Sequence, residues 1–123
     1  MGLDMYAYRV DKKYKTPVIT NDIEDVDEIY YWRKNRHLHN LIKWLYIKKG
    51  GKSEFNMVFV ELTADDIDLL EGMITSGAIE QFDEQGFYFG HNDYDSKDYD
   101  LAFIEVAREV LADGDKVYYY CWW

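Results

Sequence analysis

The side chains best suited to chemistry in this sequence are a run of cations followed by a histidine and an asparagine, and an acidic, tyrosine-containing loop further on. Hydrophobic spacing predicts a helix over about residues 33–49, which places the cations at its N-terminus, where backbone N–H groups also point outward. Guanidinium and ammonium groups beside such N–H groups can hold a phosphate or a carboxylate. The sequence therefore predicts a binding or hydrolytic site for a phosphorylated or nucleotide-like molecule. Its ligand-binding residues would be Arg33, Lys34, His39, Asn40, Tyr94 and Asp95.

The histidines of this helix have a second interpretation. A histidine on a helix flank beside aromatic rings is more often a hydrogen-bonded packing residue than a catalyst, and His39 fits that description. His37 and His39 lie about 200° apart around the helix axis, so they cannot share one metal ion. The single cysteine, Cys121, allows no internal disulfide and completes no zinc-binding pattern. We expect neither a metal ion nor a cofactor.

Familiar catalytic motifs are absent from the sequence. It contains no glycine-rich phosphate loop, no nucleophile elbow and no zinc-protease motif. The acidic string 93–98 resembles a calcium loop, but it lacks the glycine and the bidentate glutamate that such a loop needs, and helix capping explains it better. These absences favour a binding protein over an enzyme without excluding catalysis.

The formal net charge of −10 is divided unevenly along the chain. Residues 1–53 carry eleven Lys and Arg against seven Asp and Glu, a net charge of +4, whereas residues 54–123 carry three against seventeen, a net charge of −14. A polyanion would be repelled, so nucleic-acid binding is disfavoured. Acidic side chains at the starts of two later helices predict a docking surface for a protein partner, although solvated helix starts would carry the same residues. They are Asp65, Asp66, Asp68, Asp98 and Asp100.

The pattern of apolar residues predicts a single α+β domain over residues 1–123. Strands are expected at 2–10, 55–62, 86–90 and 116–123, and helices at about 33–49, 63–77 and 97–112. Residues 29–32 form either a short strand or the entry to the first helix, and the polar stretch 11–22 has no predicted element. The strands are rich in aromatic residues and no phosphate-type glycine loop connects them. This favours a mostly antiparallel sheet of four or five strands, with about three helices against one face, over a doubly wound parallel sheet.

The aromatic tail at 118–123 is too apolar to remain in water. It must pack either as a core strand or against another chain, which leaves a homodimer open. The N-terminus has no signal-peptide pattern, and no apolar stretch is long enough to span a bilayer. We therefore expect a cytoplasmic protein with no membrane partner.

Three short motifs occur in order along the chain. They are Gly-Leu-Asp-Met-Tyr at 2–6, Tyr-Trp-Arg-Lys at 31–34 with His-Asn at 39–40, and Gly-Phe-Tyr-Phe-Gly at 86–90 with Tyr-Asp at 94–95. Together they resemble small uncharacterised proteins of tailed bacteriophages and prophages. The resemblance implies a bacterial or phage cytoplasmic setting but no reaction, because no activity is established for that family. It favours a non-enzymatic accessory protein that binds a host or anti-phage-defence component, with the small-ligand protein described above as the alternative.

Overall fold

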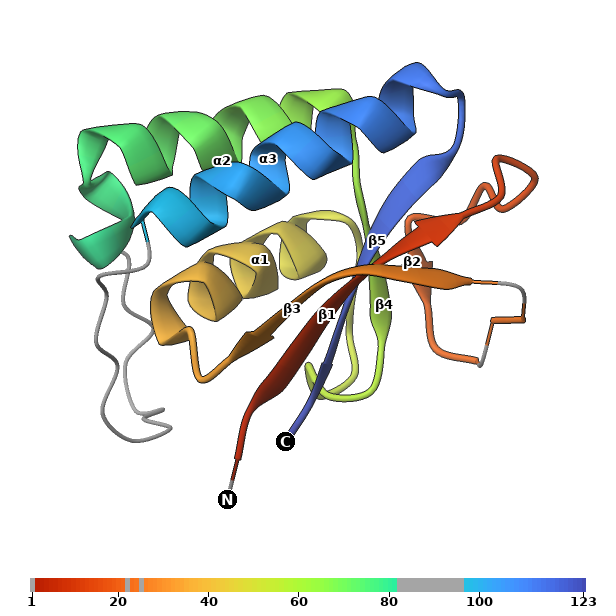
Figure 1. Cartoon of the computed structure of the whole chain (residues 1–123). Helices are drawn as coiled ribbons and strands as arrows, with labels where there is room; N and C mark the ends of the chain where they lie inside the picture. Colours follow the sequence, from red (N-terminus) through yellow and green to blue (C-terminus); the bar gives the residue numbers. More distant parts are fainter. Residues whose placement is uncertain (1, 22, 25, 82–96) are drawn as a thin grey trace.

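Three α-helices lie on one side of an antiparallel sheet in the computed structural model, which describes residues 2–21, 23–24, 26–81 and 97–123 (Figure 1). The strands within these residues are β1 (Asp4–Val10), β2 (Val18–Ile19), β3 (Asp27–Arg33), β4 (Phe59–Leu62) and β5 (Lys116–Trp122). The helices are α1 (Arg36–Lys48), α2 (Ala64–Ser76) and α3 (Lys97–Ala112), with a 3-10 turn, η1, at Ala78–Gln81. The predicted α+β fold is confirmed, with a five-stranded sheet and three α-helices among the described residues.

The first and last strands meet at the centre of the sheet. Strand order is β2-β4-β5-β1-β3, and every neighbouring pair is antiparallel. β1 and β5 pair over seven residues, from Asp4 opposite Trp122 to Val10 opposite Lys116. The two ends of the chain accordingly lie side by side in Figure 1. The strands that are furthest apart in the sequence therefore form the middle of the sheet.

Alternation along the central strands divides the apolar residues between the two faces of the sheet. Met5 and Tyr119 join a large core that includes buried residues of all three helices. A smaller cluster around Phe59 and Tyr118 lies on the opposite face, where Ile23 packs against it. The helix-covered face thus holds the main core, and the other face holds a second one.

The first helix begins three residues later than the sequence predicts. Residues 27–33 instead form β3, which pairs with β1. Residues 29–32, for which the sequence allows a short strand or a helix entry, therefore belong to a strand. Lys34 then turns the chain with a positive φ of 58°. Asn35 caps α1 by accepting a hydrogen bond from the Leu38 N–H at 3.2 Å. Arg33 is therefore a strand residue and not part of the helix start.

Two strands also differ from the prediction. β4 begins at Phe59 and not at residue 55, because Met57 has a φ of 59°, in the left-handed region, which interrupts the extended chain. β2 forms within the polar stretch for which the sequence predicts no element, and its two residues pair with β4. The strand predicted at 86–90 lies outside the described residues.

α2 and α3 keep the bounds that the sequence predicts. Thr63 caps α2 through reciprocal hydrogen bonds with Asp66, and Gly77 ends the helix with a φ of 80°. α3 occupies the predicted 97–112 segment. No helix among the described residues is both long enough and apolar enough to cross a membrane.

Candidate ligand pocket

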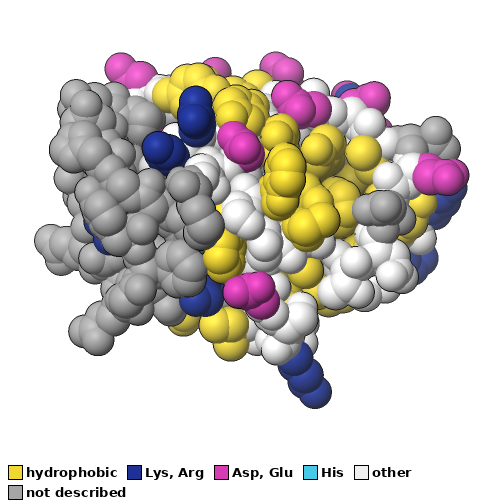
Figure 2. Space-filling view, turned by 90° about the horizontal axis from the view of Figure 1, so that it is seen from below, with side chains coloured by type: hydrophobic (Ala, Val, Ile, Leu, Met, Phe, Trp, Pro, Cys, Tyr) yellow, Lys and Arg dark blue, Asp and Glu magenta, His cyan; other side chains and the backbone are white. Residues whose placement is uncertain are grey.

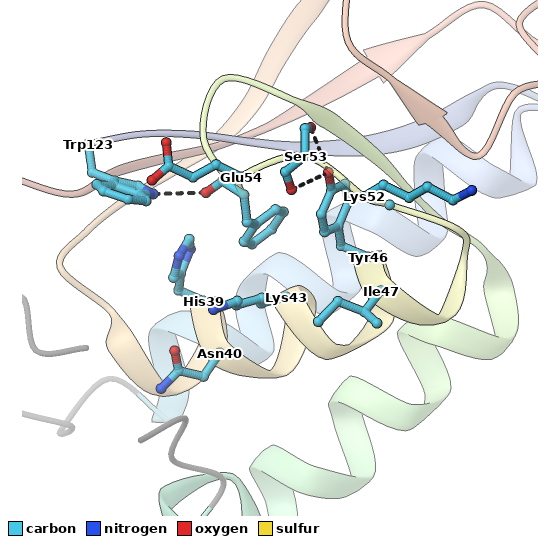
Figure 3. Close-up of a pocket in the computed structure, with 11 residues that line it drawn as sticks. His39, Asn40, Lys43, Tyr46, Ile47, Lys52, Ser53, Glu54 and Trp123 are labelled. Atoms are coloured by element: carbon cyan, nitrogen blue, oxygen red, sulfur yellow. Dashed lines mark hydrogen bonds between the residues drawn. The ribbon is translucent and has the colours of Figure 1, made fainter. Parts of the chain in front are cut away.

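A pocket of about 310 Å³ opens between α1 and the loop 51–56, which leads toward β4 (Figure 3). The residues from α1 recur at helical spacing, so their side chains share one face of the helix. The loop supplies the opposite wall, and the residue that follows β5 closes one end. The lining residues are His39, Asn40, Lys43, Tyr46 and Ile47 from α1, Gly51, Lys52, Ser53, Glu54 and Phe55 from the loop, and Trp123.

The floor of the pocket is aromatic. Phe55 stacks between His39 and Tyr46, with ring centroids 4.9 Å apart in both pairs and interplanar angles of 25° and 27°. Stacks at this distance are favourable beyond the apolar area that they bury. His39, Phe55 and Tyr46 are 3%, 4% and 2% exposed, so the floor is a preformed apolar base for the pocket.

His39 is a neutral member of this floor. The residue is 3% exposed, and its Nδ1 shares a hydrogen bond of 2.8 Å with the Tyr119 hydroxyl. Burial, helped by the nearby Lys43 ammonium, lowers the pKa of His39 to about 3. Burial also raises the pKa of Tyr119 well above its usual value. Both partners are uncharged near neutral pH, so His39 serves as a hydrogen-bonded packing residue and is poorly suited to accept a proton.

Polar groups line the rim of the pocket. The Tyr46 hydroxyl donates to the Ser53 carbonyl oxygen at 2.8 Å and lies 2.9 Å from the Ser53 Oγ. Figure 3 shows the Lys43 side chain reaching along the pocket toward the floor, whereas the Lys52 side chain points away from it. Asn40 also lines the pocket, but it is 1% exposed and its side chain points away from the floor in Figure 3. The rim therefore offers hydroxyl groups and a cation directed toward the aromatic floor, and the Glu54 carboxylate also lines the pocket.

Trp123 closes one end of the pocket and is held there by three hydrogen bonds. Its backbone N–H donates to the Asn56 Oδ1, and the Asn56 Nδ2 donates to its carbonyl oxygen, both at 3.0 Å. The indole Nε1 donates to the Phe55 carbonyl oxygen at 2.8 Å. These bonds join the loop 51–56 to the end of β5 and hold both walls in place.

Gly51 sets how closely the loop approaches α1. A Cβ atom at this position would lie 2.2 Å from the Tyr46 ring, far inside van der Waals contact. The Gly51 N–H donates to the Tyr46 carbonyl oxygen at 2.9 Å. Because only glycine permits this approach, the shape of the pocket wall depends on Gly51.

The structure brings two of the predicted ligand-binding residues into the pocket and places two others outside it. His39 and Asn40 line the pocket, and both residues are buried. Arg33 and Lys34 do not line it, because β3 runs on through Arg33 and the chain turns at Lys34 before α1 begins. Tyr94 and Asp95 lie outside the described residues.

Sequence reasoning missed the residues that complete the pocket. Lys43 and Tyr46 follow His39 by four and seven residues, which places all three on one helix face and could have indicated a shared site. No local pattern connects this face with Phe55 or Trp123, because the loop and the end of β5 reach it only through the tertiary fold.

The predicted acidic docking surface is only partly accessible. Asp66 is buried, caps α2 and forms an ion pair with Lys49 at 2.6 Å. Asp100 is 0% exposed, and its carboxylate accepts hydrogen bonds from the Trp32 Nε1 at 2.9 Å and the Asn35 Nδ2 at 3.1 Å. These two residues therefore stabilise the fold and do not face a partner. The exposed members of the set are Asp65, Asp68 and Asp98.

Comparison with protein-family models, with curated proteins and with solved structures found no significant match for this chain. Within the described ranges, no three His, Cys, Asp or Glu side chains are grouped so that they could hold a metal ion. The side chains of the pocket, an aromatic floor beneath hydroxyl, ammonium and carboxylate groups, define what it can bind.

Proposed function

We propose that this protein binds a small molecule that carries a flat ring and an anionic group, in the pocket between α1 and the loop 51–56. The observation that carries this proposal is the stacked aromatic floor with an ammonium group directed toward it. The pocket volume of about 310 Å³ lies at the lower end of the range typical of small-molecule sites, roughly 300–1,000 Å³. That size suits a ligand of one or two rings, in the class of phosphorylated or nucleotide-like molecules.

Each part of such a ligand has a counterpart in the pocket. Its ring would stack on Trp123, which lines the pocket and is half-buried, and its anionic group would accept a charge-assisted hydrogen bond from Lys43. The Ser53 hydroxyl would provide a polar contact that distinguishes one ligand from another. Because His39 is neutral and buried, these residues support binding better than hydrolysis.

Isothermal titration calorimetry with nucleoside monophosphates and aromatic carboxylates tests this proposal. The matching nucleosides and inorganic phosphate serve as partial ligands, each of which offers only one of the two recognised groups. We expect a nucleoside monophosphate to bind more tightly than either of its parts. Absence of binding by every compound would contradict the proposal.

Two lysines of the same helix provide a matched pair of variants. Lys43→Gln removes the ammonium group from the pocket and should weaken binding about tenfold, the loss expected for one charge-assisted hydrogen bond. Lys48→Gln makes the same change outside the pocket, where the Lys48 Nζ lies 4.5 Å from the centroid of the Trp44 ring. Equal losses of affinity in the two variants would show that Lys43 has no specific role.

A second candidate is an accessory protein that docks on a host or defence protein in the cytoplasm through its helix layer. Support comes from Asp65 and Asp98, which are exposed acids at the starts of α2 and α3. Replacing both with lysine should abolish capture of a basic partner from infected cells without unfolding the domain. The control places the same charge change further along α3, at Glu105 and Glu109. Unchanged capture in the first variant would remove this candidate.

A further inference from the structure

The face of the sheet opposite the helices carries a cluster of tyrosines. Tyr6 lies at its centre, with ring centroids 5.2 Å from Tyr31 and 6.3 Å from Tyr120. The strand register explains the cluster, because Tyr6 on β1 lies opposite Tyr31 on β3 and Tyr120 on β5. All three residues are half-buried. Seen from below the molecule, apolar side chains gather across the middle of the surface (Figure 2).

One end of this face is covered and the other is open. At the covered end, Ile23 packs on Phe59 and Tyr118. At the open end, Trp122 follows Tyr120 by two residues on β5, so it lies on the same face, and it is 56% exposed. Exposed apolar side chains that gather on one face mark interaction surfaces, and tryptophan and tyrosine are among the residues that most often anchor them.

We propose that a second copy of this chain docks on this open face, so that two sheets pack face to face about a twofold axis. Face-to-face packing of sheets about 10 Å apart is a common way to bury such side chains. A twofold interface must be complementary to itself, and β3 carries both signs of charge in the exposed residues Glu28 and Arg33. These two residues lie near opposite ends of β3, so rotation about an axis near Tyr31 brings Arg33 of each copy toward Glu28 of the other.

The distribution of charge favours a second copy over other occupants of this face. The exposed carboxylates of Asp65, Asp68 and Asp98 lie on α2 and α3, on the far side of the sheet (Figure 1). Two copies that meet through their sheets keep these carboxylates far apart, although each copy has a net charge of −10. A polyanion would be repelled by the whole molecule, and a basic protein would be attracted to the helix layer instead.

Sedimentation equilibrium from about 1 to about 100 µM tests the proposal, because a dimer dissociates on dilution by mass action. We expect the wild-type protein to be mostly dimeric at the upper end of this range. Trp122→Glu places a charge within the interface and should raise the dissociation constant by at least about tenfold. Trp44→Glu is the matched control, because Trp44 is another exposed tryptophan but lies on α1.

An exchange of charges distinguishes this interface from general stickiness of the aromatic surface. Arg33→Glu should weaken the dimer, and adding Glu28→Arg to that variant should restore it. Circular dichroism confirms that each variant is folded before its mass is measured. A wild-type protein that stays monomeric at every concentration would overturn the proposal and assign the face to a different protein. The proposal would also be overturned if Trp44→Glu dissociated the dimer while Trp122→Glu left it intact.

Discussion

The two ends of α1 differ in how they use their polar side chains. At the N-terminal end, Asn35 caps the helix and also donates, together with Trp32, to the buried carboxylate of Asp100. Further along the helix, Lys43 and Tyr46 face a pocket. The polar groups at the N-terminal end thus stabilise the fold, whereas those further along the helix have open space beside them. A dense group of charged residues in a sequence therefore does not locate a site; a site forms where packing leaves a hollow next to polar groups.

Replacing Asp100 tests the structural end of α1 and should have the largest effect. Asp100→Leu leaves the Trp32 Nε1–H and the Asn35 Nδ2–H buried without this acceptor, which should lower the free energy of unfolding by about 3 kcal/mol. Urea unfolding measures the change. The folded fraction should keep the ligand affinity of the wild type, because the pocket lies further along the helix. A loss of stability below about 1 kcal/mol would show that the helix start does not depend on this carboxylate.

Replacing Gly51 tests the pocket end. In Gly51→Ala the new Cβ would overlap the Tyr46 ring, so the loop must move, which should abolish ligand binding and lower the free energy of unfolding by about 2 kcal/mol. Gly72→Ala on α2 is the control, because a Cβ there meets nothing within 4 Å. The control should gain about 0.5–1 kcal/mol from helix propensity and bind ligand normally. Calorimetric titration and urea unfolding measure both variants, and normal binding by Gly51→Ala would refute the role given to this glycine.

His39 lies between these two regions and should make stability depend on pH. Its pKa is about 3 in the folded protein and about 6.5 in the unfolded chain, so between these values the unfolded chain binds a proton that the folded protein excludes. The stability that His39 contributes is therefore complete above about pH 6.5 and declines as the pH falls toward 3.

The expected size of this pH effect is smaller than that of Asp100→Leu and close to that of Gly51→Ala. Between about pH 7 and about pH 5 the wild type should lose about 2 kcal/mol of unfolding free energy that a His39→Gln variant does not lose. Urea unfolding of both proteins at the two pH values measures the difference. Equal pH dependence in the two proteins would mean that His39 is not a buried neutral residue.

The elements that the sequence predicts well are those with local determinants. The bounds of α2 follow from the Thr63 cap and from Gly77, which adopts the left-handed conformation, and the bounds of α3 follow from its apolar stripe. The start of α1 does not follow from local pattern, because residues 27–33 pair with β1, from which the polar stretch 11–22 separates them in the sequence. Strand pairing of this kind overrides a helical interpretation of the same residues.

The pocket could be predicted only in part, for a related reason. His39 and Asn40 are candidate site residues because of their polar side chains, and they lie on a helix that the sequence predicts. Phe55 and Trp123 are joined by a hydrogen bond across 68 positions of the chain, and the conformation of the loop 51–56 depends on contacts with α1. No window of sequence contains both walls of the pocket.

The pairing of β1 with β5 at the centre of the sheet also has a consequence for the rate of folding. Arg9 and Asp115, which are joined by a hydrogen bond of 2.5 Å beside this pairing, lie 106 positions apart. Closing a loop of this length costs entropy before strand pairing can offset the cost. Domains that depend on such long-range contacts fold in milliseconds to seconds, much more slowly than helical bundles of similar size. Formation of the central strand pair is therefore the event that should limit how fast this protein reaches its native state.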